Sequence, residues 1–231
     1  MKTIDAEKII IATVHPWNIA NARKLQVQRP GVVLVTDRKK LTPGFVRRQN
    51  PRYIFFPHWS WYIQPEIFEH YECILFHMTD VPYGRGGSPL QNLIVRGHRS
   101  TKISAIKVVH AIDAGPVYLK RPLELQGNAE EIYTRCSKII FEEMIPRILE
   151  DKLIPKAQKG KVTAFKRLKP DLSCFNNFND VKKIYDHIRM LDAPGYPIAF
   201  LEFKNMTVHF SQARRVAGGK IVAKAEIKCK R

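Results

Sequence analysis

The chain has 231 residues, of which 45% are hydrophobic, and its 39 lysines and arginines against 21 aspartates and glutamates give a formal net charge of +18 and a pI near 9.9. Its apolar stretches are much shorter than the roughly 20 residues of a membrane-spanning helix, and acidic residues in its first ten positions do not fit a signal peptide, so we expect a cytoplasmic protein with no membrane partner. Its four cysteines form no C-x-x-C pair, which argues against a disulfide framework and a zinc site.

Short β-branched and aromatic runs alternate with helix-like stretches over the first two thirds of the chain. Because these runs are continuously apolar, they are typical of strands that helices cover on both faces, and they predict a doubly wound α/β fold with a mostly parallel, Rossmann-like sheet. The expected strands are 9–14, 32–36, 52–57, 73–77, 102–109 and 117–125. The expected helices are 18–28, 42–49, 65–69, 89–96 and 128–150. We expect Thr42 to cap the second helix, and Asn128 with Glu131 to form a capping box on the last.

We expect the α/β domain at 1–150, a basic linker at 151–170 and a small C-terminal α+β module at 171–231. The module should contain a helix at 181–191 and strands at 199–203, 207–211 and 221–227. Residues 152–169 hold seven lysines and arginines and no acid, and 214–231 hold seven against one glutamate. Such a surface attracts phosphate groups without specifying their source, and lysines that only solvate a face explain the same pattern.

Ligands of doubly wound sheets bind beyond the carboxyl ends of the strands. The sequence places His15 and Trp17 after the first strand. It places His58, Trp59, Trp61 and His77 at the ends of the third and fourth strands, and two tryptophans and two histidines at one sheet edge suit a pocket for a flat ring. No G-x-G-x-x-G follows the first strand, and the glycine-rich turn before the helix at 89–96 lacks the lysine and spacing of a P-loop. The sequence therefore argues against dinucleotide and nucleoside-triphosphate sites of those two kinds.

His77 and Asp113 are the candidate catalytic pair. An imidazole can take a proton from an attacking amine, and a carboxylate beside it holds the tautomer and stabilises the imidazolium. A structural interpretation stays open for both residues. A histidine after a strand is often a packed, hydrogen-bonded residue, and an aspartate before Ala-Gly often stabilises its own turn.

The segment from His77 to Pro89 resembles the H-x-S-x-x-P-x-x-R-G-x-x-P signature of the folate-dependent formyltransferase superfamily, with Thr79 at the serine position. His77 and Asp113 lie 36 residues apart (113 − 77), as expected for the histidine and the D-x-G aspartate of that family. Segment 57–63 occupies the place of the family's A-Y-G-x-I-L loop. Residues 188–191 and 195–197 are similar to its I-R-A-L and G-Y-P-G-A linker, so the resemblance spans positions 9 to 213.

The resemblance implies transfer of a formyl group from 10-formyltetrahydrofolate to a primary amine, without a metal, with His77 and Asp113 as catalytic residues. It implies that the formyl donor is bound by Ser60, Trp61, Tyr62, Ile63, Val109 and Asp113. The acceptor would be bound by His15, Trp17, Arg85 and the backbone amides of Gly86 and Gly87. Arg85 has a second interpretation, in which it ties down its own loop.

One position departs from the family pattern. The signature begins N-x-H, and its asparagine donates to the formyl oxygen, but position 75 here is Leu75. Removing one such donor typically costs about 2.7 to 4 kcal/mol of transition-state stabilisation. Asn92, Thr79 or His58 could replace the donor; altered chemistry and loss of activity are the other interpretations.

Two acceptors and one non-enzymatic role follow from the resemblance. We expect an amino-sugar nucleotide, because only 61 residues (231 − 170) follow Pro170, fewer than the C-terminal barrel of the usual methionyl-tRNA enzyme contains. Methionyl-tRNA, which suits the +18 charge, is the alternative. The third interpretation is a basic RNA-binding module on a non-catalytic formyltransferase core. A homodimer is compatible with each of them.

Overall fold

The computed structural model describes residues 8–230, which form two compact units. The first unit contains the described residues up to 85 together with 102–123 and 134–164. The second contains 86–101, 124–133 and the described residues from 165 onward. Each unit is therefore assembled from separate stretches of the chain. The domain boundaries expected near 150 and 170 remain predictions.

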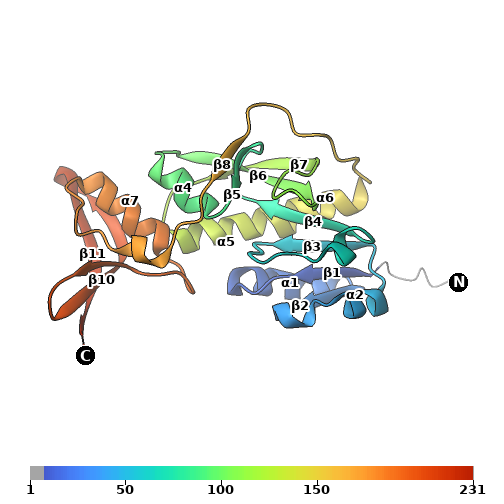
Figure 1. The fold of residues 1–231 in the computed structure, drawn as a ribbon, viewed down its shortest axis with the longest axis horizontal. Helices are drawn as coiled ribbons and strands as arrows, with labels where there is room; N and C mark the ends of the chain where they lie inside the picture. Colours follow the sequence, from blue (N-terminus) through green and yellow to red (C-terminus); the bar gives the residue numbers. More distant parts are fainter. Residues whose placement is uncertain (1–7, 231) are drawn as a thin grey trace, which may run out of the picture. The chain divides into compact units, whose positions relative to one another are not determined.

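A six-stranded sheet has the order β2-β1-β3-β4-β6-β7 (Figure 1). Its strands are β1 (Ile9–Ala12), β2 (Val32–Val35), β3 (Tyr53–Pro57), β4 (Glu72–His77), β6 (Ser100–Lys107) and β7 (Val117–Glu124). The pairs β1/β2, β1/β3 and β3/β4 are parallel, and β4/β6 is antiparallel. The predicted doubly wound, mostly parallel α/β class is confirmed, and every strand of this sheet begins and ends within two residues of its predicted bounds.

The helices also follow the sequence closely. They are α1 (Pro16–Gln28), α2 (Pro43–Gln49), α3 (Pro65–Phe68), α4 (Pro89–Val95), α5 (Ala129–Ile139), α6 (Ile145–Glu150) and α7 (Val181–Leu191). Thr42 Oγ1 accepts from the amide of Phe45, and Asn128 and Glu131 accept from each other's amides, which confirms the predicted caps. The helix predicted at 128–150 is not continuous: a π-helical turn at Ile140–Met144 separates α5 from α6. Pro146 has no N–H to continue the regular hydrogen-bond pattern there.

Helices α2 and α3 contribute to a buried cluster with the central strands. The cluster includes Ile10, Ile54, Phe56, Val46 and Ile67. Successive strand residues point to opposite faces, so the buried residues between these positions face the other side of the sheet. There the Ser137 hydroxyl of α5 donates to the carbonyl of Trp17 in α1 at 3.1 Å. The sheet therefore serves as a rigid base for the residues that follow its strands.

The glycine-rich turn at 82–89 and the linker at 151–170 differ from their predictions. Residues Tyr83–Gly86 form strand β5, and Thr163–Phe165 form β8, which pairs with it. A Cβ atom on Gly86 would lie 2.5 Å from the carbonyl oxygen of Phe165, so the pairing needs a glycine at this place. Within the stretch predicted to be a basic linker, Phe165 is buried.

The second unit contains α7 and a three-stranded antiparallel sheet in the order β11-β10-β9. These strands are β9 (Ala199–Glu202), β10 (Met206–Val216) and β11 (Lys220–Cys229), which confirms the predicted helix and three strands. The ring of Phe175 lies 5.4 Å from that of Phe210 on β10 and 5.6 Å from that of His187 on α7. Arg189, from the I-R-x-L segment, donates to the carbonyls of Leu125 and Gly127 at 2.7 and 3.0 Å.

Candidate active site

His77 is the last residue of β4, and it is 7% exposed. Its Nε2 lies 2.7 Å from the carbonyl oxygen of Gly84, and its Nδ1 lies 3.5 Å from Oδ2 of Asp113. A carbonyl oxygen only accepts, so Nε2 carries the proton in this contact. The ring is thus held between a backbone acceptor and a carboxylate.

Asp113 lies on a turn that approaches β6 closely. Its φ of 51° is in the left-handed region, which aspartate tolerates better than most residues. Two residues later, a Cβ atom on Gly115 would lie 1.8 Å from the carbonyl oxygen of Lys107, a distance that no real contact allows. The amide of Lys107 in turn donates to the carbonyl of Pro116 at 2.9 Å. The absence of a side chain at Gly115 therefore lets the turn that carries Asp113 come close to His77.

The structure brings the predicted pair together. The side chains of His77 and Asp113 are 8% and 10% exposed, so their interaction is only weakly screened by water. The separation of 3.5 Å is an ion-pair distance rather than a tight hydrogen bond. Catalytic contacts of this kind are often long before substrate binds and shorten in the reacting complex.

Thr79 replaces the serine of the family signature and keeps its hydroxyl. Its Oγ1 donates to the carbonyl of Gly84 at 3.2 Å, and the hydroxyl of Ser104 donates to the Thr79 carbonyl at 2.7 Å. His77 and Thr79 thus share one backbone acceptor. The shared acceptor ties the start of β5 to the end of β4.

Arg85, predicted to bind the acceptor, is engaged inside the first unit. Its Nε and Nη2 donate to Oε1 of Gln158 at 3.1 and 2.8 Å. These contacts support the second interpretation of Arg85, in which it ties down its own loop. Sequence reasoning missed Gln158, because it lies in the stretch predicted to be a linker and belongs to no motif.

Asn92, Thr79 and His58 are the candidates to replace the asparagine donor that position 75 lacks. Two of them already use their side-chain donors in other hydrogen bonds. Leu75 itself is partly buried and packs against the cluster under α2 and α3. The side-chain amide of Asn92 already donates to three backbone carbonyls at 3.0 to 3.1 Å, and Thr79 donates to a fourth. His58 is the remaining candidate.

The amide of Gly87 donates to the carbonyl of Phe165 at 3.0 Å. It is therefore not available to an acceptor phosphate, contrary to the sequence prediction. The corresponding role of Gly86 stays a prediction. The glycines at this turn instead allow β5 and β8 to meet.

The rings of His15, Trp17 and His58 form one stack beyond β1 and β3. The His15 ring centroid lies 4.7 Å from that of Trp17 and 4.1 Å from that of His58. Burial lowers the pKa of His15, and burial together with the nearby His15 lowers the pKa of His58 well below its usual value. Both imidazoles are therefore neutral near pH 7. Two of the residues predicted to bind the acceptor, His15 and Trp17, thus lie side by side.

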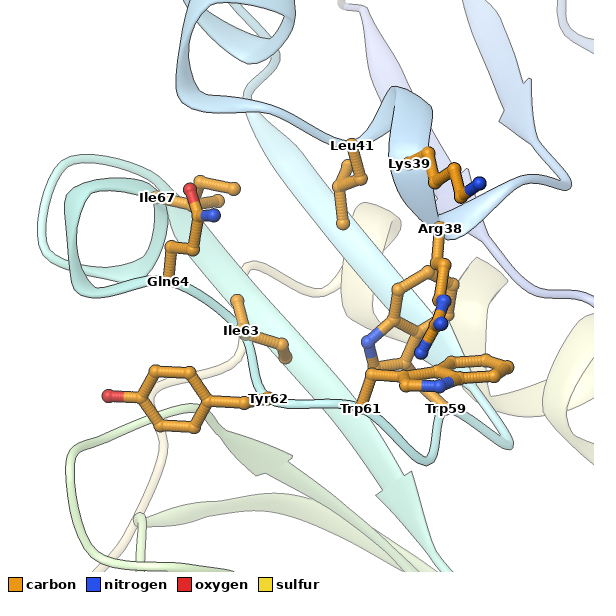
Figure 2. Close-up of a pocket in the computed structure, with 9 residues that line it drawn as sticks. All are labelled: Arg38, Lys39, Leu41, Trp59, Trp61, Tyr62, Ile63, Gln64 and Ile67. Carbon is orange, nitrogen blue, oxygen red and sulfur yellow. The ribbon is translucent and has the colours of Figure 1, made fainter.

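A cavity of about 420 Å³ lies beside the loop that follows β3 (Figure 2). It is lined by Arg38, Lys39, Leu41, Trp59, Trp61, Tyr62, Ile63, Gln64 and Ile67. The guanidinium of Arg38 lies 5.4 Å from the Trp61 ring centroid, and the rings of Trp59 and Trp61 meet edge to face at 5.0 Å. Figure 2 shows Arg38 beside both indoles, while Tyr62 extends away from them. The indole N–H of Trp59 is buried and has no hydrogen-bond partner among the described residues.

The residues predicted to bind the formyl donor divide between two places. Trp61, Tyr62 and Ile63 line the cavity, whereas Ser60 does not. Val109 lies beside the turn of Asp113, since its Cγ1 is 3.5 Å from the Cβ position of Gly115. Sequence reasoning missed the contribution of residues 38 and 39, although they follow β2 and could have been found by the same rule that selected the other post-strand residues.

Among residues 8–230, no group of three or more histidine, cysteine, aspartate or glutamate side chains is arranged to hold a metal ion. Likewise, none of the helices described there is long and apolar enough to cross a bilayer.

The fold agrees with those of known proteins. The structure of a methionyl-tRNA formyltransferase from Clostridium thermocellum is 50% identical, superposes with a TM-score of 0.95, and matches 97% of this chain and 100% of its own. The chain belongs to the folate-dependent formyltransferase superfamily. A family described as the C-terminal domain of methionyl-tRNA formyltransferase matches residues 170–228.

More distant formyltransferases are similar as well. The methionyl-tRNA formyltransferase of Thermodesulfovibrio yellowstonii is 25% identical over an alignment of 202 residues, which covers 79% of this chain and 65% of that protein. The matched part of the chain thus spans less than two thirds of this relative's length. A 4-N formyltransferase from Francisella tularensis is 13% identical, with a TM-score of 0.69 over 98% of this chain and 99% of its own, and shares the fold.

The stack of neutral imidazoles makes folding sensitive to acid. Folding keeps His15 and His58 neutral, so the stability that they contribute is complete above their unfolded pKa of about 6.5 and falls as the pH decreases below it. Each buried histidine should remove up to about 1.4 kcal/mol of unfolding free energy per pH unit. Urea unfolding at pH 7 and 5.5 measures this loss. We expect His58→Gln to lose less stability between these pH values than the parent protein.

The exposed His70 provides the matched control. The variant His70→Gln should keep the full acid sensitivity of the parent. An equal loss of stability in the His58→Gln variant and the parent would show that His58 is protonated in the folded protein.

Proposed function

We propose that this protein transfers a formyl group from 10-formyltetrahydrofolate to the methionine amino group of methionyl-tRNA. The main support for this proposal is the similarity to the Clostridium thermocellum methionyl-tRNA formyltransferase, which is 50% identical over essentially the whole of both chains. The sequence favoured an amino-sugar nucleotide because the C-terminal part is short. That reason fails, since this chain covers 100% of a structure bearing the methionyl-tRNA name.

The geometry of His77 supports acid–base catalysis. When an amine attacks a formyl carbon, the nitrogen gains positive charge and must lose a proton. Asp113, 3.5 Å from Nδ1, stabilises the imidazolium that forms when His77 takes this proton. A neutral imidazole carries one proton, so Nε2 can accept the proton of the amine only after it has left the Gly84 carbonyl and the ring proton has moved to Nδ1, which faces Asp113.

The cavity after β3 suits the folate that brings the formyl group. It combines the indole face of Trp61, the unpartnered buried N–H of Trp59 and the cations of Arg38 and Lys39. Flat rings stack on indoles, and carboxylates bind guanidinium groups, so this set fits a molecule with a heteroaromatic ring and an acidic tail. Its volume of about 420 Å³ lies in the range of ligand sites. Bound folate supplies the formyl carbon, and the protein supplies the proton acceptor.

The basic surfaces suit a nucleic-acid acceptor. Lys224 and Lys228 of β11 pair with Ser211 and Thr207 of β10, so their side chains lie on the same face of the sheet. Phe210, the strand neighbour of Ser211, points to the opposite face, where it contacts Phe175. The lysine face is exposed, and it can bind phosphates without disturbing the packing of this unit.

The catalytic pair can be tested directly. We expect His77→Ala and Asp113→Ala each to lower the rate of formyl transfer by at least about a hundredfold, the lower range for positioned acid–base groups. Because the two side chains act as one unit, the double variant should be scarcely slower than either single variant. Rates are measured with saturating methionyl-tRNA, and circular dichroism checks folding. Near-normal turnover in either folded single variant would place the active site elsewhere.

The nature of the acceptor predicts a steep dependence on salt. Binding of tRNA releases counterions, so between roughly 50 and 200 mM salt its affinity should fall by orders of magnitude if several phosphates are contacted. Replacing the exposed Lys159 and Lys161 with glutamine should make the slope of log affinity against log salt concentration less steep, by somewhat under one unit for each lost phosphate contact.

The control for this experiment removes two charges of α1, in the double variant Arg23→Gln and Lys24→Gln. It should leave the slope as it is in the parent. A shallow salt dependence in the parent would exclude broad contact with tRNA. Steep binding without formylation of the methionine would show nonspecific attraction by a basic protein.

A further inference from the structure

The side chain of Gln158 makes four hydrogen bonds within the first unit. Its Oε1 accepts from Nε and Nη2 of Arg85 at 3.1 and 2.8 Å, and its Nε2 donates to the carbonyls of Asp113 and Gly115, each at 2.8 Å. A guanidinium only donates and a carbonyl only accepts. The amide of Gln158 therefore has a single orientation that satisfies all four contacts.

These contacts reach both neighbours of the His77 ring. Gly84, whose carbonyl binds Nε2 of His77, directly precedes Arg85 in β5. Asp113, whose carboxylate faces Nδ1, is held through its own carbonyl. Gln158 thus links the two residues that face the two nitrogens of one imidazole.

The backbone on either side of Gln158 is anchored as well. Lys156 and Val117 exchange two backbone hydrogen bonds at 2.7 and 2.9 Å, and the amide of Thr163 donates to the carbonyl of Pro82 at 3.1 Å. The segment is therefore fixed before and after Gln158. A side chain held in this way can impose its position on the turn that it contacts.

We propose that Gln158 is a positioning residue for formyl transfer, which sets the placement of Asp113 and Gly84 around His77. It touches the backbone of the turn rather than the reacting atoms. The inference rests on the proposed function of His77 and Asp113. The two donated hydrogen bonds, 2.8 Å each, carry the positional effect, because they hold the turn on both sides of Ala114.

Two variants separate the two ends of the amide. Gln158→Leu removes all four hydrogen bonds at similar volume, and Gln158→Glu keeps acceptors for Arg85 but cannot donate to the turn. We expect kcat with methionyl-tRNA to fall about ten- to hundredfold in both, because small misplacements of catalytic groups have effects of this size. The KM for 10-formyltetrahydrofolate should change little. Gln28 is an exposed glutamine of α1, so the variant Gln28→Leu is the matched control and should keep the parent kcat.

A double-mutant cycle tests the route of the effect. In an Asp113→Asn background, Gln158→Leu should slow the reaction much less than it does in the parent, since the position of the carboxylate no longer matters. An equal effect in both backgrounds would overturn the proposal, as would a parent-like kcat in folded Gln158→Leu or Gln158→Glu.

A spectroscopic readout keeps this inference distinct from the proposed function. The ring resonances of His77, assigned by their loss in His77→Gln, should shift in Gln158→Leu at constant pH and stay in place in Gln28→Leu. Unchanged His77 resonances in both Gln158→Leu and Gln158→Glu would refute the positioning role. If the parent transfers no formyl group, the proposed function fails, and this shift still decides whether Gln158 positions the ring's neighbours. Should Gln158→Leu fail to fold, the resonances of Gln158→Glu decide.

Discussion

The close approach between the turn of Asp113 and strand β6 is the constraint on which the site depends. A side chain at Gly115 would overlap the carbonyl oxygen of Lys107, since the Cβ position lies only 1.8 Å from it. Because the glycine allows this contact, the left-handed Asp113 can direct its carboxylate at His77. Strand β4 places His77 at the sheet edge, and antiparallel β6 places the turn beside it. The proposed catalytic pair is therefore positioned by two strands and one glycine.

A buried histidine between two acceptors needs support from its surroundings. In this protein the support consists of neutral amides and hydroxyls: Gly84 binds the ring, Thr79 binds the same carbonyl, and Gln158 holds the turn. None of these groups would compete for the proton that His77 accepts in the proposed reaction, because amides and alcohols do not titrate near neutral pH. The charge of Asp113 is left as the group that stabilises an imidazolium. The family signature adds an asparagine that donates to the formyl oxygen, but position 75 is Leu75 here. In the proposed reaction, His77 and Asp113 therefore contribute a larger share of the transition-state stabilisation.

Local signals account for what the sequence predicted well. Continuous apolar runs fixed the strands of the central sheet, and Thr42 and Asn128 marked helix starts, because each signal depends on residues near in sequence. The His77–Asp113 pairing was suggested by residue chemistry and by the position of His77 at the end of a strand, and the resemblance supported it. Two features that the sequence did not predict depend on contacts between distant segments: the pairing of β5 with β8 and the four hydrogen bonds of Gln158. Such contacts leave no pattern in a single sequence.

The length of the C-terminal part favoured an amino-sugar nucleotide as the acceptor, whereas the similarity to a methionyl-tRNA formyltransferase favours methionyl-tRNA. One assay decides it most directly: purified protein with 10-formyltetrahydrofolate, offered methionyl-tRNA and a panel of amino-sugar nucleotides side by side, with the formylated products identified by mass. Our account predicts formylmethionyl-tRNA and no formylated sugar nucleotide. Formylation of a sugar nucleotide while methionyl-tRNA stays unmodified would contradict it, and no transfer to any amine would leave a formyltransferase fold without the activity assigned to His77 and Asp113.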